Sequence, residues 1–298
     1  MQSLEPKKHK RLAPGGGGGG CWLGGPMTDS SHKYQKARRG ECAPPTGDYE
    51  YPTDALQSGA GTSIFDPVLC ELVYRWFCPA GGSVLDPFAG GSVRGIVAVK
   101  LGYSYTGVEL RNEQVLANVK QAKAIGLKPR WIVGDSAKLD TMVKGKYDLV
   151  FSCPPYYDLE VYSDADGELS SMPTYVTFLA AYRKIISSAV GKLKENRFAC
   201  FVVGDVRDKT GCYRNFVGDT VAAFIDAGAQ LYNEGILVTA LGSLPIRVGR
   251  QFNSGRKLGK THQNVLVFYK GNPKKIKTEF GEVVRDDDLV GSESGLEQ

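Results

Sequence analysis

The sequence has few histidines, and its cysteines lack the spacing that builds metal sites and disulfide frameworks. It has three histidines and seven cysteines in 298 residues, and no two cysteines stand in a Cys-x-x-Cys spacing. Metal sites usually show closely spaced His and Cys ligands, and this chain has few histidines and widely scattered cysteines. The composition therefore argues against a metal site. Several cysteines fall within apolar strand or helix patterns, which indicates reduced core thiols and a cytoplasmic protein.

Long apolar runs are also missing. No stretch approaches the roughly 20 residues that a helix needs to cross a bilayer. The basic start is followed by Pro14 and the glycines 15–20, where a signal peptide would need an apolar stretch. We therefore expect neither a membrane segment nor export. With 42% hydrophobic and 23% charged residues, the composition is typical of a soluble globular protein.

Residues 1–62 have the composition of a tail. Basic residues flank the glycine run, and a proline-rich stretch follows. Chains this rich in glycine and proline do not recover the entropy lost on folding, so we expect disorder. Two interpretations stay open, a functionless solvated extension and an arm that binds nucleic acid.

From residue 63 onward, strand and helix patterns alternate. A helix is expected at 67–77, with Asp66 as its N-cap. Further helices are expected at 94–101, 112–125, 136–143, 173–193 (with proline in its first turn) and 213–227. Strands are expected at 83–87, 105–110, 130–134, 147–151, 197–206, 230–240 and 264–270.

This alternation with short connections predicts an α/β fold, a parallel Rossmann-like sheet with helices on both faces. The last two of the seven strands stand next to each other along the chain and predict a C-terminal antiparallel hairpin. We expect one domain at 63–271, followed by a polar C-terminal tail at 272–298.

The first expected strand ends in Asp86-Pro87-Phe88-Ala89-Gly90-Gly91, at the edge where ligands bind in open α/β sheets. The Gly-x-Gly-x-x-Gly spacing of dinucleotide sites is absent, and a carboxylate at this position would repel a pyrophosphate. A cationic ligand fits better, because Asp86 can hold a sulfonium or ammonium group and Gly90 lets the ligand approach the backbone.

The next two strands also end in carboxylates. Glu109 can accept the two hydrogen bonds of a ribose diol, and Asp135 or the amide after it can contact an adenine edge. Each residue taken alone could be a solvated strand end. Three at successive strand ends of one edge favour a binding site.

Together these motifs resemble those of the DNA amino-methyltransferases, which methylate the exocyclic nitrogen of adenine (N-6) or cytosine (N-4). The resemblance rests on the Asp86 segment, Glu109, Gly134-Asp135 and Cys153-Pro154-Pro155-Tyr156, taken in order. Phe65-Asp66-Pro67 resembles the segment that closes over the methionine end of the cofactor, and residues 260–271 resemble the family's last strand. The likeness covers about 63–271, and the wider pattern is similar to solitary enzymes of phages and prophages.

The resemblance implies S-adenosylmethionine (SAM) as cofactor and the cytoplasm of a bacterial or phage-infected cell as location. The SAM-binding residues that it implies are Phe65, Pro67, Asp86, Phe88, Gly90, Glu109, Asp135 and Ser136. The catalytic residues that it implies are Cys153, Pro154, Pro155 and Tyr156. The Pro154 carbonyl would accept a hydrogen bond from the target amine, and Tyr156 would stack on a base flipped out of double-stranded DNA. The methyl group would then move in line, with the rate coming mainly from placement.

Cys153 departs from the family, which has Asp, Asn or Ser before the two prolines. A thiol is a weak hydrogen-bond partner, so activation would depend on the Pro154 carbonyl, helped by Ser152 or Asp158. Covalent attack by Cys153 is a minor alternative, since cytosine carbon-5 enzymes place their cysteine after the prolines. A protein that binds SAM without transferring the methyl group is another alternative.

Residues 242–262 contain basic side chains and no acidic one. A long glycine-containing loop of this charge suits phosphate contacts, although a merely soluble loop is the alternative. The DNA-binding residues that we predict are Arg247, Arg250, Arg256, Lys257, Lys260 and His262. Tyr157 and Tyr162 either pack or stack on bases, with packing favoured.

No separate recognition domain is visible in the sequence. Sequence specificity would therefore come from these loops, a partner or a second subunit, and a homodimer is one of the options. Two functional alternatives remain at this stage. One is methylation of an amine in RNA, and the other is a catalytically silent DNA-binding protein.

Overall fold

The computed structural model describes residues 64–157, 167–238 and 244–281 of the chain. They fall into two units, of which the larger spans residues 63–238 and 262–298, and the smaller spans residues 1–62 and 239–261. The predicted residues Tyr162 and Asp158 lie outside the described residues, as does the predicted tail at 1–62. Five described cysteines are free thiols, and three of these (Cys70, Cys78 and Cys200) are buried.

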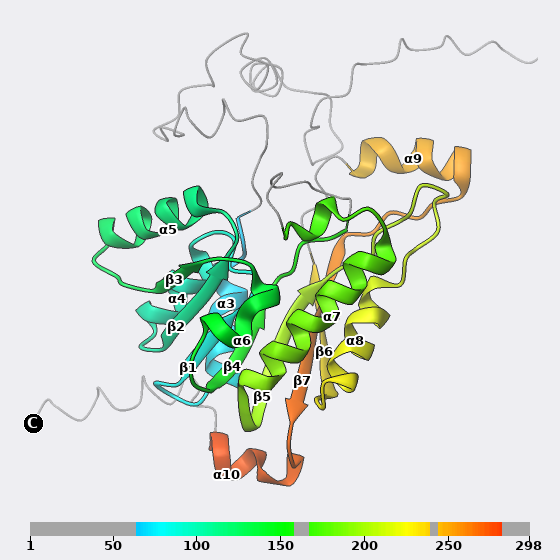
Figure 1. Ribbon diagram of the computed structural model, residues 1–298. Helices are drawn as coiled ribbons and strands as arrows, with labels where there is room; N and C mark the ends of the chain where they lie inside the picture. Colours follow the sequence, from blue (N-terminus) through cyan, green and yellow to red (C-terminus); the bar gives the residue numbers. More distant parts are fainter. Residues whose placement is uncertain (1–63, 158–166, 239–243, 282–298) are drawn as a thin grey trace, which may run out of the picture. The chain divides into compact units, whose positions relative to one another are not determined.

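A seven-stranded sheet forms the centre of the larger unit (Figure 1), in the order β3-β2-β1-β4-β5-β7-β6. The strands are β1 (Ser83–Asp86), β2 (Ser104–Glu109), β3 (Arg130–Val133), β4 (Tyr147–Ser152), β5 (Leu193–Val203), β6 (Gln230–Val238) and β7 (His262–Lys270). Strands β1 to β5 pair in parallel, and β7 runs antiparallel to both β5 and β6. The expected α/β sheet with its antiparallel C-terminal pair is confirmed.

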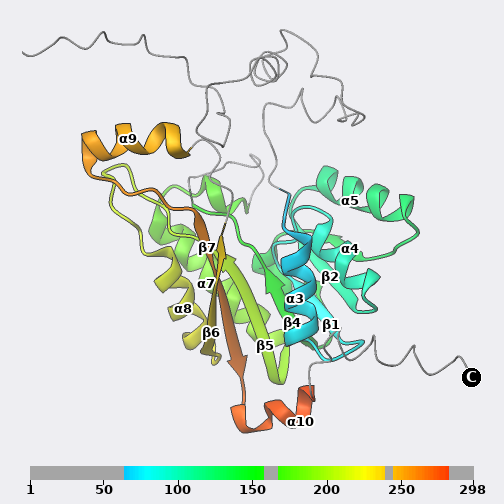
Figure 2. The ribbon, with the colours of Figure 1, turned by 180° about the vertical axis from the view of Figure 1, so that it is seen from behind.

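Helices cover both faces of the sheet (Figures 1 and 2). The helices of this unit are α3 (Pro67–Phe77), α4 (Val93–Lys100), α5 (Asn112–Ala124), α6 (Leu139–Met142), α7 (Tyr175–Lys192), α8 (Phe216–Asp226) and α10 (Ile276–Phe280), with 3-10 turns at Ser136–Lys138, Leu169–Ser171 and Pro273–Lys275. Helix α10 lies beyond the lower ends of the strands in Figure 1. The buried strand β4 shows how the two faces are divided. Its Leu149 and Phe151 join a core under α3 and α4, whereas Val150 joins a core under α6, α7 and α8.

Local sequence explains where the helices begin and how closely they pack. Asp66 accepts hydrogen bonds from the backbone N–H groups of Val68 and Leu69, so it is the N-cap that we predicted for α3. Gly95 lets α4 approach the sheet closely, because a Cβ there would lie 2.7 Å from the Trp131 ring and 2.9 Å from Tyr105.

Three expectations about elements are wrong. Pro173 precedes the first turn of α7, because Thr174 is the N-cap and forms a capping box with Thr177. Helix α8 begins at Phe216 rather than at residue 213, because Arg207 pairs with Tyr213 in a small hairpin. The expected loop at 242–262 contains the helix α9 (Leu244–Gly255), which belongs to the smaller unit.

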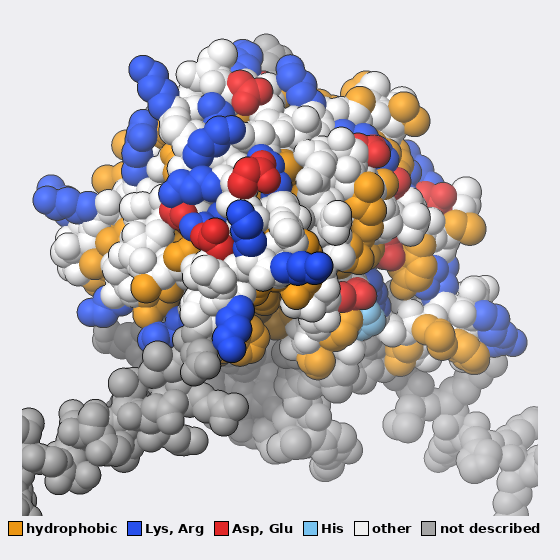
Figure 3. Space-filling model, turned by 90° about the horizontal axis from the view of Figure 1, so that it is seen from below, with side chains coloured by type: hydrophobic (Ala, Val, Ile, Leu, Met, Phe, Trp, Pro, Cys, Tyr) orange, Lys and Arg blue, Asp and Glu red, His pale blue; other side chains and the backbone are white. Residues whose placement is uncertain are grey.

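Residues 273–280, part of the expected polar tail, form a 3-10 turn and the helix α10. Phe280 of α10 packs against Phe198 with ring centroids 5.1 Å apart, and Glu279 accepts a hydrogen bond from Arg197 at 2.8 Å. Figure 3 shows the molecule from below, the side on which α10 lies in Figure 1. Lysine and arginine side chains are spread over this face, with acidic side chains among them.

Candidate active site at the carboxyl edge of the sheet

The last residue of β1, Asp86, is fully buried and fully hydrogen-bonded. One carboxylate oxygen accepts from Ser152 Oγ at 2.5 Å and from the Phe88 backbone N–H at 3.1 Å. The other accepts from Arg94 Nε at 2.7 Å and from the Tyr105 hydroxyl at 2.8 Å. A carboxylate has about four acceptor positions, and these four bonds fill them.

Arg94 neutralises the charge of Asp86. Burial alone lowers the pKa of Arg94, but the carboxylate outweighs it, so this pKa lies above its ordinary value. Burial, with Asp86 next, raises the pKa of Tyr105 well above its ordinary value. The charge of Asp86 is therefore already paired with Arg94, and the predicted contact between Asp86 and a cationic ligand stays a prediction.

The same arginine fastens the loop that follows β1. Its Nη2 donates to the carbonyls of Phe88 and Ala89, at 2.6 and 3.0 Å. The Phe65 ring lies against the guanidinium, 4.7 Å from its carbon, and contacts Phe151 edge-on. Asp86 and Arg94 thus fix the shape of the loop through hydrogen bonds to its backbone, and the Phe65 ring packs against the Arg94 guanidinium.

Gly90 and Glu109 form the half-buried part of this site. Gly90 has φ +51°, and a Cβ at either Gly90 or Gly91 would meet open space. The Gly90 N–H donates to one oxygen of Glu109 at 2.9 Å, and the Arg111 N–H donates to the other at 3.0 Å. Each oxygen of Glu109 still has acceptor capacity, so this half-buried carboxylate can take hydroxyl donors beside the glycines.

The end of β3 joins the same edge. Asp135 caps a 3-10 turn by accepting from the Ala137 N–H at 2.8 Å, and Ser136 donates its hydroxyl to the Pro87 carbonyl at 2.5 Å. The structure therefore brings both residues to the Asp86 loop. Of the other predicted cofactor residues, Phe88 packs inward against Tyr182 and Phe201, and Pro67 is the exposed first residue of α3.

Ser152 joins this loop to the predicted catalytic segment. Its hydroxyl donates to Asp86 and accepts from the Phe88 N–H at 3.1 Å. Because Ser152 immediately precedes Cys153, the segment 153–156 starts at the glycine loop. Cys153 is half-buried, Pro154 is buried and Pro155 is half-buried.

Tyr156 is held in one orientation at the far end of this segment. Gln263, the second residue of β7, donates its amide N–H to the Tyr156 hydroxyl at 2.6 Å. The Tyr156 ring meets Phe216 edge-on, with centroids 5.8 Å apart, and remains half-exposed. Tyr157 instead packs with Tyr175 and Phe178, as we expected when we favoured packing.

The predicted DNA-binding residues fall into different units. Arg247, Arg250, Arg256, Lys257 and Lys260 belong to the smaller unit, in α9 and the residues after it, and Arg250 and Arg256 are exposed. His262 begins β7 in the larger unit and is half-buried. Their contact with DNA stays a prediction.

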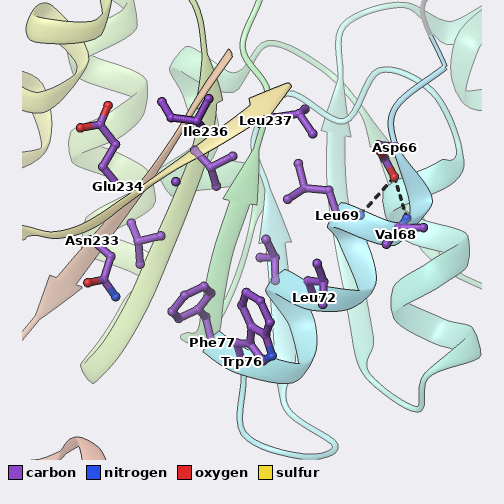
Figure 4. Close-up of a pocket in the computed structure, with 14 residues that line it drawn as sticks. Asp66, Val68, Leu69, Leu72, Trp76, Phe77, Asn233, Glu234, Ile236 and Leu237 are labelled. Atoms are coloured by element: carbon purple, nitrogen blue, oxygen red, sulfur yellow. Dashed lines mark hydrogen bonds between the residues drawn. The ribbon is translucent and has the colours of Figure 1, made fainter. Parts of the chain in front are cut away.

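An apolar groove of about 510 Å³ lies between α3 and strands β6 and β7 (Figure 4). Leu69, Leu72 and Trp76 form one wall, and Ile236 and Leu237 belong to the other. None of the predicted site residues lines this groove. Across the described part of the chain, no three His, Cys, Asp or Glu side chains converge to hold a metal ion, and no helix is long and apolar enough to cross a membrane.

Sequence reasoning missed three residues of the site. Arg94 follows Asp86 by eight residues, and a basic residue at the first turn of a helix is uncommon enough to have served as a signal. Ser152 was considered only as a helper of catalysis. No sequence pattern gave a reason to connect Gln263 with Tyr156, because the two residues are 107 positions apart.

No protein-family model and no curated protein sequence matches the chain. Several solved structures are similar to it at low identity. TrmN from Thermus thermophilus has a TM-score of 0.48 and 16% identity, over 71% of this chain and 51% of TrmN, so the chain spans about half the length of that protein.

Two further similar structures come from other bacteria. An rRNA methylase from Streptococcus thermophilus has a TM-score of 0.46 and 9% identity, over 71% of this chain and 100% of that one. A TehB-like SAM-dependent methyltransferase from Corynebacterium glutamicum has a TM-score of 0.42 and 16% identity, over 72% and 91% of the two chains.

Proposed function

We propose that the protein is a SAM-dependent methyltransferase that transfers a methyl group to the exocyclic amino nitrogen of adenine or cytosine in DNA. The single observation that carries this proposal is the position of Ser152. Its hydroxyl binds both Asp86 and Phe88 of the glycine loop, and the next residue begins Cys153-Pro154-Pro155-Tyr156. A cofactor on the loop and a flat substrate on Tyr156 would therefore be neighbours.

The residues fit SAM, with one change from the sequence prediction. Gly90 and Gly91 leave open space for a ligand against the backbone, and Glu109 can bind the ribose diol beside them. Asp135 and Ser136 would hold the adenine side. Because Asp86 is neutralised by Arg94, its contribution is the shape of the loop rather than a direct charge contact. Bound SAM would supply an electrophilic methyl group on a sulfonium.

The protein's own contribution to the reaction is placement. The exocyclic amine of a base is a weak nucleophile because its lone pair is delocalised into the ring. A hydrogen bond from that amine to the Pro154 carbonyl would localise the lone pair, and proline fixes the direction of this carbonyl. Tyr156, held by Gln263, would support the face of a flipped base.

The test is methyl transfer from isotope-labelled SAM to defined nucleic acids by the full-length protein. Unmethylated double-stranded DNA and RNA of matched sequence are offered separately, and the modified nucleoside is identified by mass spectrometry. N-6-methyladenosine or N-4-methylcytidine in their deoxy forms would support the proposal. Label in RNA alone would assign the substrate to RNA, and SAM binding without transfer to either would refute the enzymatic function.

Tyr156→Ala provides a matched control for this experiment. It should lose transfer while keeping its SAM affinity by calorimetry, because the glycine loop does not depend on this ring. A fully active Tyr156→Ala protein would remove the stacking role from Tyr156.

A further inference from the structure

A small hairpin stands just after β5 at the same edge of the sheet. Strand β5 ends at Val203, and Arg207 and Tyr213 then pair as an isolated antiparallel bridge. The Arg214 N–H donates to the Val206 carbonyl at 3.0 Å, and the Asp208 N–H donates to the Cys212 carbonyl at 2.8 Å. None of the predicted catalytic or SAM-binding residues lies in this hairpin.

The tip of the hairpin is held by one carboxylate oxygen. Asp208 Oδ1 accepts from the Thr210 hydroxyl at 2.6 Å and from the backbone N–H groups of Thr210, Gly211 and Cys212 at 2.9, 2.9 and 3.1 Å. These bonds, the Thr210 hydroxyl first, lower the pKa of Asp208. The only acidic side chain of residues 206–214 is thus turned into its own loop, while Arg207, Lys209 and Arg214 carry positive charge.

Arg207 and Tyr213 form a flat stacked pair. The guanidinium carbon of Arg207 lies 3.9 Å from the centre of the Tyr213 ring, and its Nη1 donates to the Gly211 carbonyl at 2.8 Å. Tyr213 remains 45% exposed. A guanidinium fixed in this way keeps further N–H donors, and stacking on a tyrosine places its charge at a defined position.

The hairpin is anchored to the proposed catalytic segment. Arg214 lies over the rings of Tyr157 and Tyr175, with its guanidinium carbon 4.8 and 5.1 Å from their centres. Tyr157 directly follows Tyr156. A strand of nucleic acid whose target base stacked on Tyr156 would therefore continue beside residues 207–213.

We propose that this hairpin is a binding platform for the nucleic-acid strand next to the target base. The exposed Tyr213 ring would stack on a neighbouring base, and Arg207 and Lys209 would contact a phosphate. A fixed cation beside an exposed aromatic ring is the combination that binds single-stranded segments without reading their sequence. The inference rests on the proposed function for its substrate, and its test is independent of methyl transfer.

The experiment measures binding of fluorescently labelled single-stranded DNA to the full-length protein by anisotropy, without SAM. Tyr213→Ala should weaken binding about 5- to 150-fold, the range expected for losing one stacked base. Tyr213→Phe should retain most of the affinity, because the ring remains. Arg207→Gln should reduce the slope of log affinity against log salt concentration by about 0.7, which corresponds to one phosphate contact on a single strand.

Tyr232→Ala is the matched control, since this tyrosine of β6 is 44% exposed and lies outside the hairpin. The inference is overturned if Tyr213→Ala binds like the native protein, if Tyr232→Ala weakens binding equally, or if the native protein binds neither DNA nor RNA oligonucleotides. Binding that depends on Tyr213 without any methyl transfer would support the platform and refute the proposed function. Methyl transfer by a protein whose DNA binding does not depend on Tyr213 would support the proposed function and refute the platform.

Discussion

Two clusters of aspartate and arginine stand at opposite ends of the same sheet and have different consequences. At the carboxyl end, Asp86 and Arg94 are both nearly inaccessible, and Arg94 also binds two carbonyls of the glycine loop. At the other end, Asp148 accepts from Lys194 at 2.8 Å and from Arg197 at 3.2 Å. Lys194 keeps 44% of its side chain exposed.

The hydrogen-bond partners of each cluster show which parts of the structure it connects. Arg94 connects Asp86 to a loop whose glycines face open space, so this pair determines the geometry of the proposed SAM site. Asp148 also accepts from the backbone N–H of Ser83, and Arg197 continues to Glu279 in α10. The second cluster therefore joins β1, β4, β5 and the C-terminal helix, and it contacts no predicted site residue. The same residue types would preorganise the proposed ligand site at one end and fasten the fold at the other.

The largest expected effect is that of Arg94→Met. It leaves the Asp86 carboxylate buried without its cation, which should cost about 3–5 kcal/mol in the free energy of unfolding. The glycine loop also loses its anchor, so SAM affinity should fall by at least about tenfold. Urea unfolding measures the first effect, and calorimetry under conditions where the variant is folded measures the second.

Arg197→Met is the matched comparison, because it removes an arginine beside an aspartate at the opposite end. Lys194 still compensates Asp148 there, so the loss of stability should be smaller and SAM affinity should not change. Equal losses of SAM affinity in the two variants would mean that the clusters do not differ in the way described.

Asp148→Asn should have the next largest effect. The amide keeps the shape of the side chain but loses charge-assisted hydrogen bonds from Lys194 and Arg197, and we expect a loss of about 1–3 kcal/mol in unfolding free energy. SAM affinity should stay at the native value, since no contact connects Asp148 to the glycine loop. A loss of SAM binding in a folded Asp148→Asn protein would show that the two ends are coupled.

The fold was more predictable than the site. Helix α3 and the run of strands through β4 follow from local periodicity and capping, such as Asp66 before Pro67. The sequence also predicted that the acidic residues Asp86, Glu109 and Asp135 share one edge of the sheet, and the structure places them there. Whether a carboxylate faces a ligand or a partner from the next helix depends on packing, so the pairing of Asp86 with Arg94 could not be derived from strand ends alone.

The errors have local causes. Residues 244–255 contain two glycines, and Gly259 follows shortly after, which favoured a loop over the helix α9 that is present. Tyr213 continued an apolar spacing into α8, but Asn215 adopts φ +62° and starts the helix later. Contacts such as Gln263 with Tyr156 depend on the order of β7 in the sheet, which the sequence pattern did not specify.

The pH dependence of folding stability should report on the Asp148 cluster, at the end of the sheet opposite Asp86. Burial would raise the pKa of Asp148, but hydrogen bonds from Lys194, Ser83 and Arg197 outweigh it and lower the pKa from 3.8 to about 2. A carboxylate with a lowered folded-state pKa stabilises the fold above its unfolded pKa, and this contribution is lost as the pH falls toward the folded value. The native protein should therefore lose stability between about pH 4 and pH 2.

The comparison with Asp148→Asn isolates this effect, because other carboxylates such as Asp208 titrate in both proteins. The difference in unfolding free energy between the two proteins should be constant above pH 5 and shrink as the pH approaches 2. A difference that does not change with pH would assign the stabilisation to packing rather than to the charge.

The smallest expected effect concerns Gln263, the residue of β7 that orients Tyr156 at the carboxyl edge. Gln263→Leu removes the donor to the Tyr156 hydroxyl but keeps a side chain of similar size, and one net hydrogen bond is worth about 0.5–1.5 kcal/mol. If that energy is used to hold the ring for a flipped base, kcat should fall about 2- to 10-fold with SAM affinity unchanged.

Tyr156→Phe removes the same hydrogen bond from the other partner, so it should give a similar loss of kcat. The double variant should then be no worse than either single variant. Additive losses in the double variant would mean that Gln263 and Tyr156 act separately, and that the bond between them is only a feature of packing.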